Sequence, residues 1–179
     1  MSALFTRNRV IGLVFAAIVL VIDQAVKAWV IGPLALRQVR KIDILPFFDF
    51  TYVENRGMSL GMFQAESMEA RWFLVGLTAL IALVVLVWMM REKLLGDILA
   101  LGLILGGAIG NIIDRYSLGY VIDYADFHIG DFRPFLVFNI ADAAITIGVV
   151  IILARSLFIR EKSGDEPGGR APAAAPSEN

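Results

Sequence analysis

Two copies of an Asn-x-x-Asp pattern, each at the end of a membrane-length apolar segment, are the residues of this chain best suited to chemistry. The first copy is Asn111–Asp114 and the second is Asn139–Asp142. Ionisable side chains at membrane depth are costly, and their presence there indicates a functional site. A third carboxylate, Asp123, lies between the two copies. Together these acids predict acid–base chemistry at a membrane surface.

Asp123 and Asp142 form the strongest candidate pair. Neither has a basic residue next to it in the sequence, and Asp142 stands among Ile and Ala residues. Apolar surroundings and a second nearby carboxylate keep one carboxyl protonated while the other is ionised near neutral pH. The ionised acid takes a proton from water while the protonated one polarises a scissile carbonyl, as in an aspartic protease. The same residues also suit a proton or ion relay, and the spacing leaves both interpretations open.

Two further charged pairs accompany these acids. Arg115 directly follows Asp114, and we expect it to hold that carboxylate ionised, so that Asp114 supports the site rather than carrying the reaction. Asp23 and Lys27 have i,i+4 spacing on one predicted helix and can neutralise each other. The Asp23–Lys27 pair fits a structural ion pair and a functional one equally well.

Other catalytic schemes find little support in the sequence. The chain has no cysteine, which excludes a disulfide, a thiolate nucleophile and a Cys-metal site. The single histidine, His128, lies among acidic residues and is expected to be a surface loop residue. No serine stands in a nucleophile-elbow pattern, and no carboxylate spacing is typical of a metal site. We therefore expect neither a metal nor a cofactor.

Long apolar segments must position these residues. The chain has 179 residues, 58% of them hydrophobic, with a mean hydropathy of +0.73 and a net charge of −1. No basic tract for nucleic acid is present. A bilayer-spanning helix needs about 20 mostly apolar residues, and four runs qualify, at residues 10–31, 72–90, 96–113 and 136–154. Gly102, Gly106 and Gly110 in the third run have small-xxx-small spacing, which predicts close helix packing.

Basic residues in the short flanking segments predict the orientation. They precede the first run, fill the tight turn between the second and third, and follow the fourth, which places both termini in the cytoplasm. The third run then ends at the outer side with Asp114. If the fourth begins near Leu136, Asp142 lies about 9 Å deeper, at 1.5 Å per residue. Asp23, Asp123 and these two acids therefore converge on the outer leaflet.

The remaining segments predict a single membrane domain over residues 1–162, with outer segments at 32–71 and 114–135. Phe48–Tyr52 alternates with period two and is expected to be a half-buried strand, whereas Asp123 is expected in a loop. Residues 163–179 are rich in Pro, Gly and Ala and are predicted to be a disordered cytoplasmic tail. The expected fold is an all-α integral membrane protein, with four transmembrane helices and a small extracytoplasmic β-sheet on the outer membrane face.

These motifs together resemble the lipoprotein signal peptidases of bacteria, also called signal peptidase II or peptidase family A8. Any one motif is weak, but five occur in the family's order and spacing. The matching segments are Asp23–Lys27, Asn55–Gly61, Gly106–Arg115, Val121–Tyr124 and Phe138–Ile145.

The resemblance implies a membrane aspartyl endopeptidase in the bacterial cytoplasmic membrane. Such enzymes cut diacylglyceryl-modified prolipoproteins immediately before the lipidated cysteine, at the outer membrane face, and are inhibited by globomycin. On this resemblance Asp123 and Asp142 would be the catalytic dyad, in a protein expected to be a monomer in contact with membrane lipids. The expected supporting or substrate-binding residues are Asp23, Lys27, Asn55, Gly57, Asn111, Asp114, Arg115 and Asn139.

The chain departs from the family pattern at three positions. Ser59 and Leu60 replace a small apolar and an aromatic residue after Asn55, and Tyr124 stands where Phe is common. These changes affect a predicted substrate-cradling loop and leave the dyad intact. The main alternative is a small proton- or ion-coupled transporter, which would need polar groups along the full membrane thickness. A non-enzymatic membrane scaffold gives no reason for carboxylates to gather at one depth.

Overall fold

The fold was analysed in a computed structural model that describes residues 6–58, 63–64 and 68–161. Ser59, Leu60 and the predicted tail at 163–179 lie outside these residues. Within them, four helices are long and apolar enough to cross a membrane, as the sequence predicted. They are α1 (Arg7–Ile31), α3 (Met68–Arg91), α4 (Leu95–Ser117) and α5 (Ile140–Glu161). A one-turn helix, α2 (Leu36–Val39), follows α1.

Helix α4 packs against all three other long helices. Its glycines permit this, because a Cβ on Gly106 would lie 2.5 Å from the Ala16 carbonyl oxygen of α1. A Cβ on Gly107 would lie 2.5 Å from the Ala141 carbonyl oxygen of α5. The predicted close packing along this helix is confirmed. The outward faces of α1, α3 and α5 carry many exposed large apolar side chains, as lipid-facing helices do.

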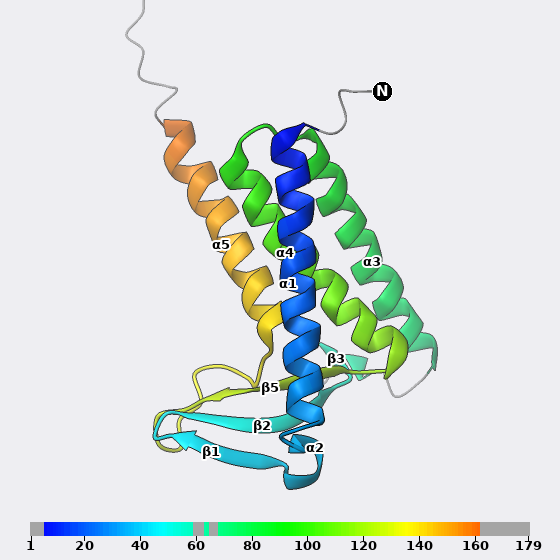
Figure 1. The fold of residues 1–179 in the computed structure, drawn as a ribbon, viewed down its shortest axis with the longest axis vertical. Coiled ribbons are helices and arrows are strands. Elements are labelled where there is room, and N and C mark those ends of the chain that lie inside the picture. The colour runs from blue at the N-terminus through cyan, green and yellow to red at the C-terminus, as the bar shows by residue number, and fades with distance from the viewer. Residues whose placement is uncertain (1–5, 59–62, 65–67, 162–179) are drawn as a thin grey trace, which may run out of the picture.

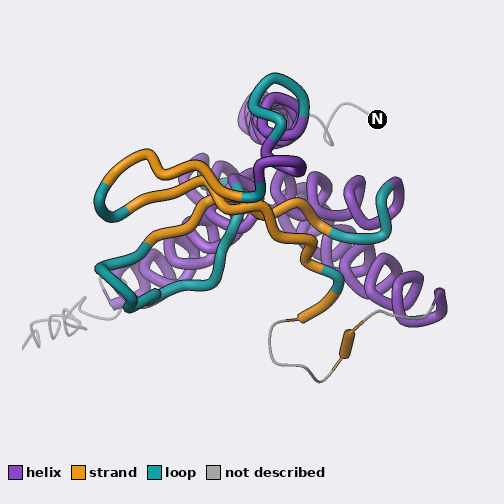
Figure 2. Tube along the Cα trace, turned by 90° about the horizontal axis from the view of Figure 1, so that it is seen from below, coloured by secondary structure: helices purple, strands orange, loops and turns teal. Residues whose placement is uncertain are grey.

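An antiparallel three-stranded sheet crosses one end of the helix bundle (Figures 1 and 2). Its order is β1 (Lys41–Leu45), β2 (Phe48–Asn55), β5 (Val121–Phe127). The strand predicted at Phe48–Tyr52 is therefore confirmed within β2. The short strands β3 (Gly57–Met58) and β4 (Phe63–Gln64) pair with each other.

Asp123 lies on β5, paired with Val53 of β2, so its predicted place in a loop is wrong. The segment Val121–Phe127 is rich in β-branched and aromatic residues, which favour strands, and all but its last residue are buried. Strand β5 leaves the end of α4 and leads towards α5, so Asp123 lies between the two helices that carry the Asn-x-x-Asp patterns.

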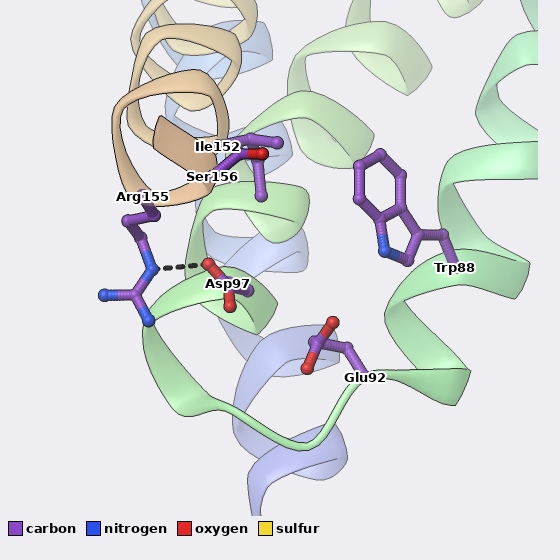
Figure 3. A pocket seen from close by; sticks show the side chains of 6 residues that line it. All are labelled: Trp88, Glu92, Asp97, Ile152, Arg155 and Ser156. Atoms are coloured by element: carbon purple, nitrogen blue, oxygen red, sulfur yellow. Dashed lines mark hydrogen bonds and ion pairs between the residues drawn. The ribbon is translucent and has the colours of Figure 1, made fainter. Parts of the chain in front are cut away.

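The ends of the described chain, at Thr6 and Glu161, lie at the end of the bundle opposite the sheet (Figure 1). There the Nε of Arg155 on α5 donates to Oδ1 of Asp97 in the first turn of α4. The pair borders a cavity of about 130 Å³ that Trp88 and Glu92 also line (Figure 3). This ion pair ties α4 to α5 far from the sheet.

Candidate active site

The second Asn-x-x-Asp copy begins helix α5. The backbone N–H of Asp142 donates to Oδ1 of Asn139 at 2.9 Å, and the backbone N–H of Asn139 donates back to Oδ2 of Asp142 at 3.3 Å. This reciprocal pattern is a capping box with Asp in place of Glu. Helix α5 thus starts at Ile140 rather than near Leu136, because Asn139 caps it. The expectation that Asp142 lies about 9 Å beyond the start of this helix is therefore wrong, since Asp142 stands in the first turn of α5.

Asn139 and Asn111 connect the two candidate acids. The side-chain amide of Asn139 donates to Oδ1 of Asp123 at 2.7 Å, and that of Asn111 donates to Oδ1 of Asp142 at 2.8 Å. The same Asn139 nitrogen lies 3.3 Å from Oδ1 of Asn111. The structure therefore brings Asp123 and Asp142 into one hydrogen-bonded network through two of the predicted supporting residues.

Asn55 binds Asp123 from the other side. At the end of β2, its Nδ2 donates to Oδ2 of Asp123 at 2.9 Å. Its Oδ1 accepts the backbone N–H of Gly57 at 3.2 Å, which orients the amide. The predicted residues Asn55 and Gly57 thus act together, because the Gly57 N–H holds the Asn55 amide with its Nδ2 towards the acid.

Asp123 is protonated over an unusually wide pH range for an aspartate. Only 2% of the surface of Asp123 is exposed. Burial, followed by the negative charge of Asp142, raises the pKa of Asp123 to about 7. The amide donors of Asn55 and Asn139 oppose this rise because they stabilise the ionised form. Near neutral pH this carboxyl can therefore act either as a proton donor or as an acceptor.

Lys27 binds two buried carboxylates beside the pair. Its Nζ lies 2.8 Å from Oδ2 of Asp23 and 2.8 Å from Oδ2 of Asp114. The predicted Asp23–Lys27 pair is confirmed. The expected Asp114–Arg115 pair is wrong, because consecutive helical side chains point in different directions while Lys27 reaches Asp114 from the neighbouring helix.

Gln24 is a residue that sequence reasoning missed. Its Nε2 donates to Oδ2 of Asp23 at 3.1 Å and to Oδ1 of Asp114 at 3.0 Å. Asp23 in turn accepts the backbone N–H of Ala141 at 3.0 Å, so it also binds the first turn of α5. The sequence did offer a signal for Gln24, because it is a polar residue between Asp23 and Lys27 within a predicted membrane span.

Arg115 faces the acids without pairing to them. The carboxylates that act most strongly on its charge are Asp142 and Asp123, ahead of its neighbour Asp114. Within the described part of the chain, no carboxylate lies within 4.0 Å of its guanidinium, and its buried Nε has no hydrogen-bond partner. A guanidinium held in this way can donate to a carbonyl oxygen of a bound peptide.

Arg71, in the first turn of α3, was also missed. Its Nε donates to the Arg115 carbonyl oxygen at 2.9 Å, and its guanidinium also donates to the Tyr116 carbonyl. These carbonyls lie in the last turn of α4, where most carbonyls lack a helical partner. The Arg115 carbonyl also accepts the Gly119 N–H at 3.2 Å. Arg71 therefore fixes the backbone that carries Arg115.

His128 is less exposed than the sequence indicated. Its Nε2 lies 2.8 Å from Oδ2 of Asp49, and its side chain is 15% exposed. Lys41 also binds Asp49, at 2.9 Å. The ion pair of His128 is therefore with Asp49 of strand β2. In the described ranges no group of three His, Asp or Glu side chains is placed to hold a metal ion.

Comparison with known proteins decides the family. The family model described as signal peptidase (SPase) II matches residues 15–158. The chain is 56% identical over 154 residues to a lipoprotein signal peptidase of Rhizorhabdus wittichii, covering 86% of this chain and 90% of the relative. It is 52% identical over 153 residues to one from Sphingopyxis alaskensis, covering 86% and 88%. The chain belongs to the signal peptidase II family.

Solved structures agree with the fold of this signal peptidase II family member. One structure, described as a bacterial membrane enzyme at 1.9 Å resolution, has a TM-score of 0.66 and 28% identity, covering 82% of this chain and 92% of that one. Another with the same description, at 2.3 Å, has a TM-score of 0.71 and 24% identity, covering 89% and 94%. Four long helices with a small antiparallel sheet are therefore an arrangement that known bacterial membrane enzymes share.

Proposed function

We propose that this protein is an aspartic endopeptidase that removes the signal peptides of diacylglyceryl-modified prolipoproteins, cutting just before the lipidated cysteine. Family membership supports the substrate class. The observation that carries the chemistry is the network that joins Asp123 and Asp142 through Asn139 and Asn111. One member of this pair is buried with a pKa raised to about 7, as an acid that must hold a proton near neutral pH requires.

In the proposed reaction Asp142 is the general base. Its Oδ1 accepts from Asn111 and its Oδ2 from the Asn139 backbone, so both carboxylate oxygens are held in place. Asp142 takes a proton from water as the water oxygen attacks the scissile carbonyl carbon. Protonated Asp123 gives its proton to the carbonyl oxygen, and a neutral gem-diol forms.

Collapse of the gem-diol completes the cycle. Asp142 returns its proton to the leaving amine as the C–N bond breaks, and Asp123 recovers a proton from the diol as the carboxylic acid product forms. The pair ends in its starting protonation state, so no cofactor is consumed. Arg115 is proposed to bind a substrate carbonyl oxygen with the donors that it leaves unpaired, which would orient the peptide over the acids.

The membrane arrangement is part of the proposal. Both termini are proposed to be cytoplasmic, with the sheet and the acids near the outer face of the cytoplasmic membrane. A substrate anchored by its acyl chains would arrive in the membrane plane, and β2 would cover the peptide from above. A monomer holds all the proposed catalytic residues, and globomycin is the expected inhibitor.

The placement of buried polar residues favours a peptidase over a transporter. A relay would need polar groups along the whole membrane thickness. Among the described residues, the buried charged and amide side chains all lie on the sheet or on the helix segments nearest to it. They are Asp23, Lys27, Asp49, Asn111, Asp114, Asp123, Asp126 and Asn139.

A cleavage assay tests the proposal. Purified protein in detergent micelles is incubated with a diacylglyceryl-modified prolipoprotein, and the same precursor without lipid serves as the control. We expect cleavage before the modified cysteine by the wild type and a loss of at least about 1,000-fold for Asp123→Asn and Asp142→Asn, since each removes a proton-transfer group. Wild-type cleavage by either variant would disprove the dyad, and no cleavage of the lipidated precursor by wild type would disprove the function.

A further inference from the structure

The buried ammonium group of Lys27 has a third contact, which links it to the acids. Besides Asp23 and Asp114, its Nζ donates to Oδ1 of Asn111 at 3.2 Å. The residue is 2% exposed, and all three partners are buried as well. Asn111 is the residue whose amide nitrogen donates to Asp142. A continuous path of two hydrogen bonds therefore runs from Lys27 to the proposed base.

The chemistry of an ammonium group fixes the direction of this path. An ammonium group has three donors and no acceptor. An Asn side chain ends in an NH₂ donor and an oxygen acceptor of similar shape, so its amide can be turned either way unless its partners select one orientation. If the Asn111 amide were flipped, its NH₂ would face the Lys27 ammonium, and its oxygen would face a carboxylate oxygen of Asp142. Both contacts would then be repulsive. Lys27, which donates to Oδ1 of Asn111 together with Nδ2 of Asn139 at 3.3 Å, thus favours the orientation in which Asn111 donates to Asp142.

The two other amides of the site are oriented in a different way. Oδ1 of Asn139 accepts the backbone N–H of Asp142, and Oδ1 of Asn55 accepts that of Gly57. A backbone N–H can only donate, so these orientations follow from the local fold. Of these three amides, only Asn111 takes its orientation from a charged side chain on another helix.

We propose that Lys27 is a positioning residue that locks the amide of Asn111 as a donor to Asp142 and thereby keeps Asp142 as the base of the pair. A donor on Oδ1 of Asp142 leaves that oxygen no room for a proton on the same side, so the oxygen faces Asn111 as an acceptor before the base takes a proton from water. Asp23 and Asp114 hold the ammonium in place. This inference rests on the proposed function, because it assigns a role within the same site.

The test must separate this role from the neutralisation of buried charge. Lys27→Met alone would leave Asp23 and Asp114 buried without a cation, which is strongly destabilising. The double variant Lys27→Met/Asp114→Asn leaves only Asp23 without a cation, and Asp23 keeps its hydrogen bonds from Gln24 Nε2 and the Ala141 N–H. In wild type one lysine and two aspartates give a net charge of −1, and in the double variant Asp23 alone gives the same −1. The net charge is retained while the donor to Asn111 is lost.

The control breaks an ion pair between α4 and α5, the helices that carry Asn111 and Asp142. Arg155→Met removes the contact between Arg155 of α5 and Asp97 of α4 (Figure 3), at the end of the bundle far from Asn111 and Asp142. Each variant is assayed for kcat and KM on the lipidated prolipoprotein, and its thermal unfolding is recorded by tryptophan fluorescence. The control is expected to unfold at a lower temperature with kcat unchanged.

For the double variant we expect kcat to fall about 10- to 100-fold, as when outer residues that orient a working group are removed, with KM within about two-fold of wild type. A folded double variant with wild-type kcat would overturn the inference. If the double variant does not fold, a cycle between Lys27→Arg and Asn111→Ala decides instead. Loss of the Lys27→Arg effect in the Asn111→Ala background supports the lock, whereas independent effects overturn it. Failure of the wild type to cleave would instead contradict the proposed function.

Discussion

The hydrogen bond from Asn55 to Asp123 allows the acid's role to be tested through the pH dependence of cleavage. If protonated Asp123 is the proton donor, kcat/KM must fall as the pH rises through its pKa, which is about 7. Asn55→Leu removes the donor to Oδ2 and keeps a side chain of similar size. A donor stabilises the carboxylate, so its loss favours the protonated acid and raises the pKa.

The magnitude follows from the strength of one such bond. A hydrogen bond to a charged group contributes about 1.5 to 3 kcal/mol, and a change of 1 in pKa corresponds to about 1.4 kcal/mol. The alkaline limb of the kcat/KM profile should therefore move from near 7 to about 8 to 9 in the Asn55→Leu variant. The variant would be slower than wild type at pH 6, because the backbone N–H of Gly57 loses its acceptor, yet relatively more active at pH 8.

The assay is cleavage of a lipidated prolipoprotein in micelles between pH 5 and 9, at substrate concentrations well below KM. Thr51→Val is the matched control, because Thr51 of β2 donates at 3.0 Å to Asp126, another buried carboxylate of β5. Its profile should coincide with that of wild type. An alkaline limb that stays in place or moves to lower pH in Asn55→Leu would refute the assignment of Asp123 as the acid.

Three further predictions follow from the same structure. Asp123→Asn should raise the unfolding temperature more at pH 8 than at pH 5, because the stability that the acid supplies at low pH is lost between its ordinary pKa of 3.8 and its raised pKa of about 7. Equal effects at both pH values would contradict the burial argument. Arg71→Gln should remove the guanidinium bonds to the Arg115 and Tyr116 carbonyls, lower stability by about 1 to 3 kcal/mol, and reduce kcat because Arg115 is displaced. Denaturant unfolding and cleavage assays can check this against Arg71→Lys. Gly107→Val should prevent assembly of α4 against α5, since even a Cβ meets the Ala141 carbonyl oxygen at 2.5 Å; a folded variant by size-exclusion chromatography would show that the helices can separate.

The parts of the fold that depend on composition could be predicted from the sequence. The four apolar runs, the glycines of α4 and the alternation at Phe48–Tyr52 each follow from a periodicity that physical chemistry imposes on membrane helices and half-buried strands. The Asp23–Lys27 pair followed in the same way, because both residues lie on one helix and their spacing fixes their distance.

Contacts between elements could not be read from the sequence in this way. Asp114 stands beside Arg115 in the chain, but its cation is Lys27 on α1, since helix packing decides which side chains face each other. The start of α5 was misplaced because Leu136 is as apolar as the helix that follows. The capping role of Asn139 became visible only when its contacts to Asp142 were known.

The capping box at the start of α5 has a consequence for drug resistance. A bacterium that escapes an inhibitor by mutation must change residues that the inhibitor contacts without losing the fold. Asn139 and Asp142 start a membrane helix with the same atoms that are proposed to serve the reaction, so replacing either by an apolar residue would damage helix and chemistry together. An inhibitor that draws its affinity from these two residues would leave few viable escape mutations at its point of contact.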